Sequence, residues 1–228
     1  MISTVDPVTA AGLVTREVRS GSRDGRPTRI AVARRRYAAE RADVWDTMTN
    51  PERLQRWFLP VSGDLVLGGR YQLEGNAGGV VERCDAPESL AVTWEYGDLV
   101  SWLRVELSET DGGTTLELAH ESHVDPEHWV AQFGPGAVGI GWDLALHALG
   151  VYLASGDAID PAAGAAWPTT PDGTRFVRSA GEGWAAAAIA DGDEPDEARA
   201  AAERAIAFFT VPPEADGGEA PDPRPEQG

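Results

Sequence analysis

Residues 89–123 read SLAVTWEYGDLVSWLRVELSETDGGTTLELAHESH, and this stretch decides the fold class. Apolar and polar side chains alternate in three successive runs, which is typical of strands with one buried face. Asp111-Gly112-Gly113 turns the chain between the last two runs. The stretch predicts an antiparallel meander, with Trp102 on the outer face. Its inward set is Leu90, Val92, Trp94, Leu103, Val105, Leu107, Leu116, Leu118 and His120.

Upstream of the meander the sequence predicts a hairpin and two short helices. Residues 13–36 predict the hairpin, with a turn rich in Gly and Ser, and residues 40–48 predict the first helix. Asn50-Pro51-Glu52 begins the second helix, because Asn caps, Pro suits the first position and Glu suits the positive end of the dipole. This helix is predicted to end at Pro60 and to carry three residues to the core: Leu54, Trp57 and Phe58.

Two further strands are predicted between these helices and the meander. Leu65 and Leu67 precede a Gly68-Gly69 turn, and Tyr71 and Leu73 follow it, which indicates a hairpin. Residues 80–84 predict a short strand, on which Cys84 is interpreted as a small buried hydrophobic residue.

A long helix over residues 137–154, ending at Gly156, follows the meander. One stripe of this helix is apolar and suits the sheet. Asp143 and His147 lie four residues apart on another face and are interpreted as a surface pair. A flank formed by Ile140, Leu144 and Val151 is also apolar, so something should cover it.

The expected cover is a pair of helices within residues 176–209. Ser179 and Glu182 form a capping box for the first helix, which is predicted to end at Asp191. Pro195 opens the second helix, which runs to Phe209. Alternatively the flank of the long helix is a homodimer interface. The expected contacts of the cover are Trp184, Ile206 and Phe209.

The composition excludes several classes of function. The net charge of −18 disfavours nucleic-acid binding, and the single cysteine excludes a disulfide framework and suits a reducing compartment. Residues 1–13 lack the pattern of a signal peptide, and the most apolar stretch contains Asp143 and His147, so we expect a cytoplasmic protein without a membrane span. The arginines of residues 16–36 are interpreted as solubilising an edge strand.

Four segments follow from these patterns. Residues 1–28 form an N-terminal extension that supplies an edge strand of the hairpin, and residues 29–155 form the main α+β domain. Residues 156–210 form a helical extension packed on that domain. Residues 211–228, rich in Pro, Gly and acidic residues, are predicted to be a disordered acidic tail.

The order of these elements, together with five short motifs, resembles the activator of heat-shock protein 90 ATPase homologue family of the START-like, or SRPBCC, superfamily. The resemblance covers about residues 29–155 and implies a helix-grip fold: a curved antiparallel sheet around a long C-terminal helix, with a cavity between them. Eukaryotic chaperone activators of this family carry a separate N-terminal domain for which this chain has no room, which argues against a chaperone partner. The motifs are NPERLQRWF at 50–58, GDL at 63–65, GGRY at 68–71, LAVTW at 90–94 and Gly141-Trp142.

Six residues are candidates for lining that cavity. Aromatic side chains line many apolar ligand sites, although the same residues could pack as a solid core. An inward-facing histidine could orient a ligand or move a proton, or could be a core histidine bonded to a backbone carbonyl. The candidates are Trp57, Phe58, Tyr71, Trp94, His120 and Trp142.

Neither a metal nor a cofactor is predicted. His120, His123 and His128 show no recognised ligand spacing, and no glycine pair has phosphate-loop spacing. No catalytic residue is predicted either, because His120 has no evident acid–base partner. Binding of a small hydrophobic or aromatic molecule is therefore favoured over two alternatives, a cyclase- or hydrolase-like enzyme using the same cavity and a protein-interaction or chaperone co-factor module.

Overall fold

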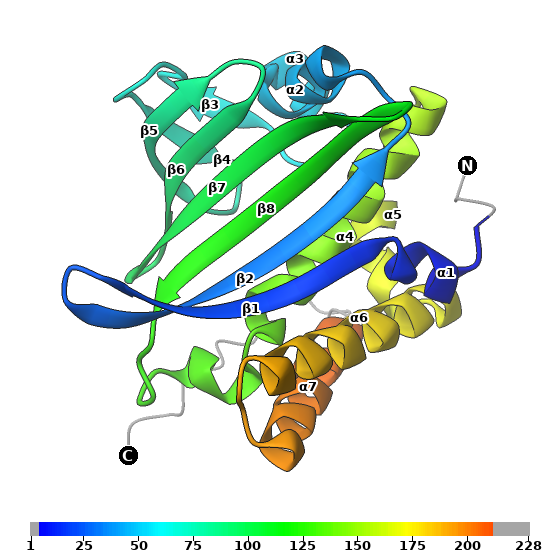
Figure 1. Cartoon of the computed structure of the whole chain (residues 1–228). Coiled ribbons are helices and arrows are strands. Elements are labelled where there is room, and N and C mark those ends of the chain that lie inside the picture. Colours follow the sequence, from blue (N-terminus) through cyan, green and yellow to red (C-terminus); the bar gives the residue numbers. More distant parts are fainter. Residues whose placement is uncertain (1–4, 212–228) are drawn as a thin grey trace.

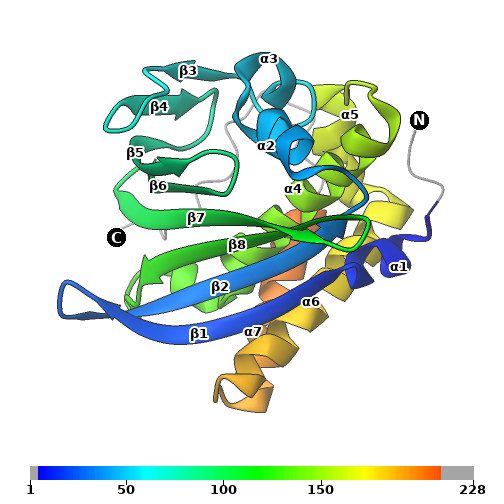
Figure 2. The same cartoon turned by 45° about the horizontal axis from the view of Figure 1, so that its top comes forward.

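The computed structural model describes residues 5–211, and one curved antiparallel sheet dominates it (Figure 1). The eight strands lie in the order β1-β2-β8-β7-β6-β5-β4-β3. Helix α4 lies along one face of this sheet, which confirms the predicted helix-grip fold (Figure 2). The strands are β1 Val14–Arg23, β2 Arg26–Tyr37, β3 Val61–Gly63, β4 Arg70–Leu73, β5 Gly78–Asp85, β6 Ser89–Tyr96, β7 Leu99–Thr110 and β8 Gly113–His123.

The helices form two groups, one near an end of the sheet and one on the far side of α4. Helices α2 and α3 lie at the end near β3, whereas α6 and α7 lie side by side below β1 and α4 (Figure 1). The α-helices are α1 Pro7–Gly12, α2 Arg41–Thr49, α3 Pro51–Leu54, α4 Gly136–Ser155, α5 Pro161–Ala166, α6 Pro171–Ala190 and α7 Pro195–Thr210, and the 3-10 helices are η1 Trp129–Phe133 and η2 Trp167–Thr169.

The register of the central strands determines which side chains face α4. Leu103 of β7 pairs with His120 of β8, and His120 pairs with Ala31 of β2. Trp94 of β6 pairs with Ser101 of β7. Because directly paired residues share a face, the inward row contains both apolar side chains and the polar pair His120 and Ser101.

The outer face of the sheet carries a lattice of ion pairs. Arg34 binds Glu117 through Nε at 2.6 Å and Glu17 through Nη2 at 2.8 Å. Not all of the N-terminal arginines are on this face, so the interpretation of them as solubilising groups is wrong in part. Arg16 and Arg35 alternate onto the inner face of their strands and are largely buried there.

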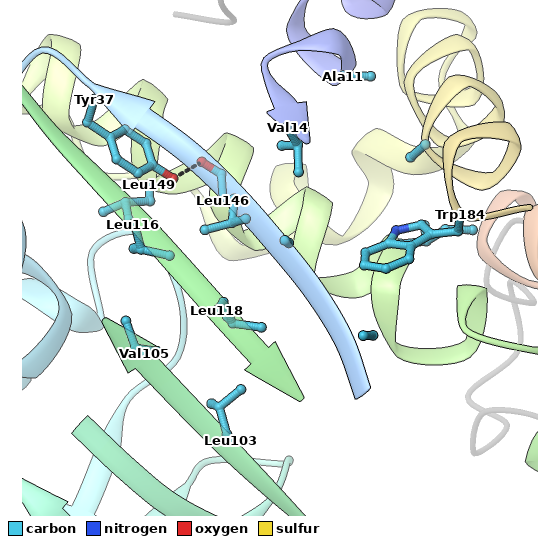
Figure 3. Packing of buried hydrophobic residues seen from close by; sticks show 14 of the residues in the cluster. Ala11, Val14, Tyr37, Leu103, Val105, Leu116, Leu118, Leu146, Leu149 and Trp184 are labelled. Atoms are coloured by element: carbon cyan, nitrogen blue, oxygen red, sulfur yellow. Dashed lines mark hydrogen bonds between the residues drawn. The ribbon is translucent and has the colours of Figure 1, made fainter. Parts of the chain in front are cut away.

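Two side chains of β2 attach the sheet to α4. The Tyr37 hydroxyl donates to the carbonyl oxygen of Leu146 at 3.0 Å (Figure 3). Nη1 of Arg35 donates to the same oxygen at 2.9 Å. Arg35 crosses α4 at Gly150, where a Cβ atom would lie 2.4 Å from its Nη2 atom. Gly150 therefore leaves room for the guanidinium of Arg35, which would have to shift for any larger residue.

Asp143 is fully buried, so its interpretation as half of a surface pair is wrong. Its carboxylate accepts two hydrogen bonds from Arg16, at 2.8 and 3.0 Å, and a third from the Trp184 indole at 2.7 Å. Burial raises the pKa of Asp143, an effect that Arg16 and Trp184 oppose. The face of α4 that carries Asp143 therefore packs against β1 and α6. The sequence around Asp143 does not predict either contact.

Helix α6 begins at Thr170 and not at the expected capping box. The Thr170 side chain accepts from the amide of Gly173, and Pro171 and Asp172 occupy the first turn. Ser179 therefore lies inside the helix. Trp184 packs against α4 at Gly139, and Ile206 lies near Ile140, which is fully buried. Leu144 and Val151 of the same flank are half-buried and line a cavity instead.

Three local predictions are wrong at or near the edge of the sheet. Leu65 and Leu67 are exposed in the β3–β4 loop, because the strand before this loop is Val61–Gly63, whose residue Val61 pairs with Leu73. Cys84 is exposed, because a bulge after Val81 interrupts the alternation from which its burial was inferred. Helix α3 ends at Leu54 and not at Pro60.

Helix α4 passes a length and composition test for a membrane span. The core helix of a globular domain passes the same test. In this structure α4 packs between the sheet and α6 and carries the buried carboxylate of Asp143. Among the helices of residues 5–211, it is the one candidate that the test finds.

Candidate functional site

Five of the six predicted site residues form one cluster on the inner face of the sheet. Trp94 from β6 lies edge-on to Trp142 from α4, with ring centroids 5.0 Å apart. Phe58, in the turn after α3, stacks on Trp57 at 5.4 Å and on Trp142 at 6.5 Å. His120 of β8 lies 5.9 Å from Trp142 and 6.2 Å from Trp94. We call these five residues the aromatic cluster: Trp57, Phe58, Trp94, His120 and Trp142.

Tyr71 does not join the ring contacts of this cluster. Its hydroxyl donates to the carbonyl oxygen of Thr93 at 2.8 Å, next to Trp94 in the chain. Burial raises the pKa of Tyr71, so the hydroxyl remains protonated. Tyr71 therefore holds the backbone that carries Trp94.

The cluster is only partly enclosed. His120 is buried, whereas Trp57, Phe58, Trp94 and Trp142 are half-buried. Their rings pack against the core with one part and present the remainder to solvent. An accessible aromatic surface of this kind can bind a flat apolar molecule.

Side chains satisfy both nitrogens of His120. The Trp142 indole donates to Nδ1 at 2.9 Å, and Nε2 lies 2.8 Å from Oγ of Ser101. An indole nitrogen only donates, so Nδ1 is the acceptor and Nε2 carries the proton that is donated to Ser101. Ser101 then donates to the carbonyl oxygen of Trp94 at 3.0 Å. The partners of His120 are thus side chains, and the expected backbone carbonyl is not among them.

This network has a directionality that matters for chemistry. In a nucleophile–base pair the histidine accepts the hydroxyl proton through one nitrogen and donates through the other to an acid. Here Trp142 supplies a donor at the position that the acid would occupy. His120 therefore cannot act as the base for Ser101 in this arrangement.

Stability should depend on pH through His120. Burial lowers the pKa of His120 to about 4, below the unfolded value, so the unfolded chain binds the proton more readily. Its contribution is complete above about pH 6.5 and is lost as the pH falls towards 4. We expect the free energy of unfolding in urea to fall by about 2 kcal/mol more in the wild type than in His120→Gln between pH 7 and 5. Equal losses would contradict the assignment.

Ser101 is a site residue that the sequence interpretation missed. It lies two residues before Leu103 and shares its inward face, so the alternation already contained the signal. A single serine near the start of a strand does not by itself predict a functional role. Its importance follows from the register, which brings it beside Trp94 and diagonal to His120.

The remaining histidines do not converge with His120. His123 lies on the outer side, with its ring 5.1 Å from that of Trp102, over which the guanidinium of Arg23 also packs at 4.2 Å. Within residues 5–211, no three His, Cys, Asp or Glu side chains come together as a metal site would require.

The comparisons with known proteins place this fold in a family. Residues 38–154, more than half of the chain, match the family described as activator of Hsp90 ATPase homolog 1-like protein. The chain belongs to this family. A comparison with curated protein sequences finds no match.

Solved structures agree with the assignment to the activator of Hsp90 ATPase homolog 1-like family. The crystal structure of CalU16 from Micromonospora echinospora is 31% identical, has a TM-score of 0.62 and covers 77% of this chain and 98% of its own. The solution structure of CalU16 gives 30% identity, a TM-score of 0.66 and coverages of 84% and 100%. MLL2253 from Mesorhizobium loti, at 21% identity, a TM-score of 0.50 and coverages of 56% and 98%, shares the fold alone.

Proposed function

We propose that this family member binds a small, flat, apolar aromatic molecule against the aromatic cluster. The observation that supports the proposal is the chain of ring contacts through Trp57, Phe58, Trp142 and Trp94, whose rings are all partly open to solvent. A half-open cluster retains apolar surface that a ligand can cover.

His120 contributes order to this site and not charge. Because both of its nitrogens are occupied and burial keeps it neutral at pH 7, it fixes the indole of Trp142 in one orientation. The resulting surface is uncharged, which suits an apolar ligand better than an ionic one. The reversed polarity of the His120 and Ser101 pair gives no support to the hydrolase alternative.

The test is a comparison of two tryptophan variants in a binding titration. We expect Trp94→Leu to weaken the binding of a naphthalene probe at least tenfold, because a packed aromatic contact contributes about 1.5–3 kcal/mol of burial. Trp102→Leu is the matched control, since Trp102 lies on the outer face of the sheet. The measurement is the saturable change in tryptophan fluorescence. A wild-type protein without saturable change, or equal weakening in both variants, would refute the proposal.

The proposal also covers the compartment of the protein and its relation to chaperones. We propose a cytoplasmic protein, which suits the exposed thiol of Cys84, and a ligand-binding role in place of a chaperone role. The chaperone alternative requires an exposed docking patch on the side of the aromatic cluster. If that alternative were correct, Trp94→Leu would reduce the binding of a chaperone and would not change the binding of the aromatic probe.

A further inference from the structure

A cavity lies on the side of α4 that faces away from the sheet. It is formed between α4 and residues 157–168 and has a volume of about 330 Å³. At about 100° per residue, its wall on α4 lies opposite the stripe of Leu146 and Leu149 that meets the sheet. The cavity shares no residue with the aromatic cluster. Its apolar wall consists of Leu144, Ala148, Val151, Ile159, Ala163 and Trp167.

One wall of this cavity is a preformed flat surface. The rings of His147 and Trp167 stack with centroids 5.0 Å apart and an angle of 17° between their planes. Behind them the fully buried Phe176 packs against both rings, at 5.1 and 5.3 Å. His147, interpreted from the sequence as a surface residue, therefore belongs to a fixed aromatic stack. Such a wall needs little reordering when a flat molecule binds to it.

The rim of the cavity is acidic. Asp157 and Asp160 are both exposed, both line the cavity, and neither forms an ion pair with another of residues 5–211. One oxygen of Asp160 accepts from the amide of Ala163 and so caps α5. The imidazole of His147 is neutral, since burial lowers its pKa to about 4, and Nδ1 makes no hydrogen bond within the described part of the chain. Among the described residues no Arg or Lys lines the cavity, and the guanidinium near its rim, that of Arg56, donates to the carbonyl oxygen of Gly156 and not to either carboxylate.

We propose that this cavity binds a small aromatic amine, with its ring in the apolar interior beside the His147 and Trp167 stack and its ammonium group at Asp157 and Asp160. The volume is at the lower end of the range for ligand sites, roughly 300–1,000 Å³, and suits one or two fused rings. The carboxylates select a cation over an anion at the mouth. This site is independent of the ligand proposed for the aromatic cluster.

The test uses tryptamine as the probe and indolepropionate as its charge-reversed counterpart. We expect tryptamine to shift NMR signals of the Trp167 indole and of the amides of Ala148 and Ile159 saturably, with indolepropionate binding at least tenfold more weakly. Trp94→Leu, in the aromatic cluster, should leave these shifts unchanged. Tryptamine shifts centred on Trp94 and Trp142, or equal affinity for both probes, would overturn the proposal.

Two kinds of variant separate the cavity from its rim. Ala148→Trp fills the cavity and should abolish the shifts. The pair Asp157→Asn and Asp160→Asn removes the charge while Asn keeps the α5 cap, and it should weaken tryptamine about fivefold and leave neutral indole unaffected. If Ala148→Trp does not fold, the Asn pair decides alone. Unchanged tryptamine affinity in the Asn pair would overturn the role of the carboxylates and with it the proposed ligand class.

Discussion

Replacing Asp143 by Asn is expected to lower the free energy of unfolding by about 3–5 kcal/mol, because a buried guanidinium then loses its counter-charge. The side chain of Arg16 is 8% exposed and that of Asp143 is not exposed at all. Asn retains the shape and, with its oxygen at the Oδ2 position, an acceptor for Trp184 and for Nε of Arg16, so the variant loses the charge and the hydrogen bond from Nη2 of Arg16. Urea denaturation at pH 7 measures the loss of stability.

The matched control is an exposed ion pair between the two C-terminal helices, α6 and α7. Arg178 of α6 pairs with Glu203 of α7 at 3.1 Å, and both side chains are half exposed or more. We expect Arg178→Met to cost less than about 1 kcal/mol. The double replacement Arg16→Met and Asp143→Leu should recover part of the stability lost in Asp143→Asn, since no unpaired charge remains but the buried Trp184 indole loses its acceptor. Equal small losses in Asp143→Asn and Arg178→Met would show that the buried pair does not hold the elements together.

The position of Asp143 shows what periodicity can and cannot predict. The alternation in residues 89–123 predicted the sheet and the inward side of His120, because a single buried face leaves a period of two in the sequence. The same reasoning treated a polar position on a long helix as solvent-exposed. Arg16 is 127 residues away in the chain, so no local pattern could show that a partner would bury the carboxylate.

In the candidate site, too, local patterns predicted some features and contacts between distant residues determined the others. Aromatic residues and family-like motifs predicted which side chains would gather, and five of the six came together. The hydrogen bonds that orient them depend on cross-strand register, as between Trp94 and Ser101, which no single run of residues encodes. The cavity behind α4 depends on the conformation of residues 157–168, for which no element was predicted.

Helix α6 gives a further example. Ser179 and Glu182 satisfy the spacing of a capping box, and Thr170-Pro171-Asp172 satisfies an equally good start nine residues earlier. The earlier start prevails because it lets Phe176 and Val177 enter the core, where both are fully buried. Tertiary burial therefore decides between two local signals of similar strength.

Truncation after Gly156 is expected to give an aggregating or unfolded protein. The truncation removes Phe176, Trp184 and Ile206, which are at most 3% exposed, and it uncovers Ile140 on α4. Each of these side chains contributes about 1.5–3 kcal/mol by burial, so their combined loss is comparable to the whole stability of a domain. The truncation also deprives Asp143 of the Trp184 indole.

A chain that ends at Val211 is the control for this truncation. The sequence of residues 212–228 is acidic and rich in Pro and Gly, so its removal should leave the melting temperature nearly unchanged. Size-exclusion chromatography and thermal melting of the two chains provide the comparison. A chain of residues 1–156 that remained monomeric and melted like the full chain would show that the sheet and α4 form a complete core. In that case α6 and α7 would be an appendage, and the burial of Ile140 and Asp143 would not be needed for folding.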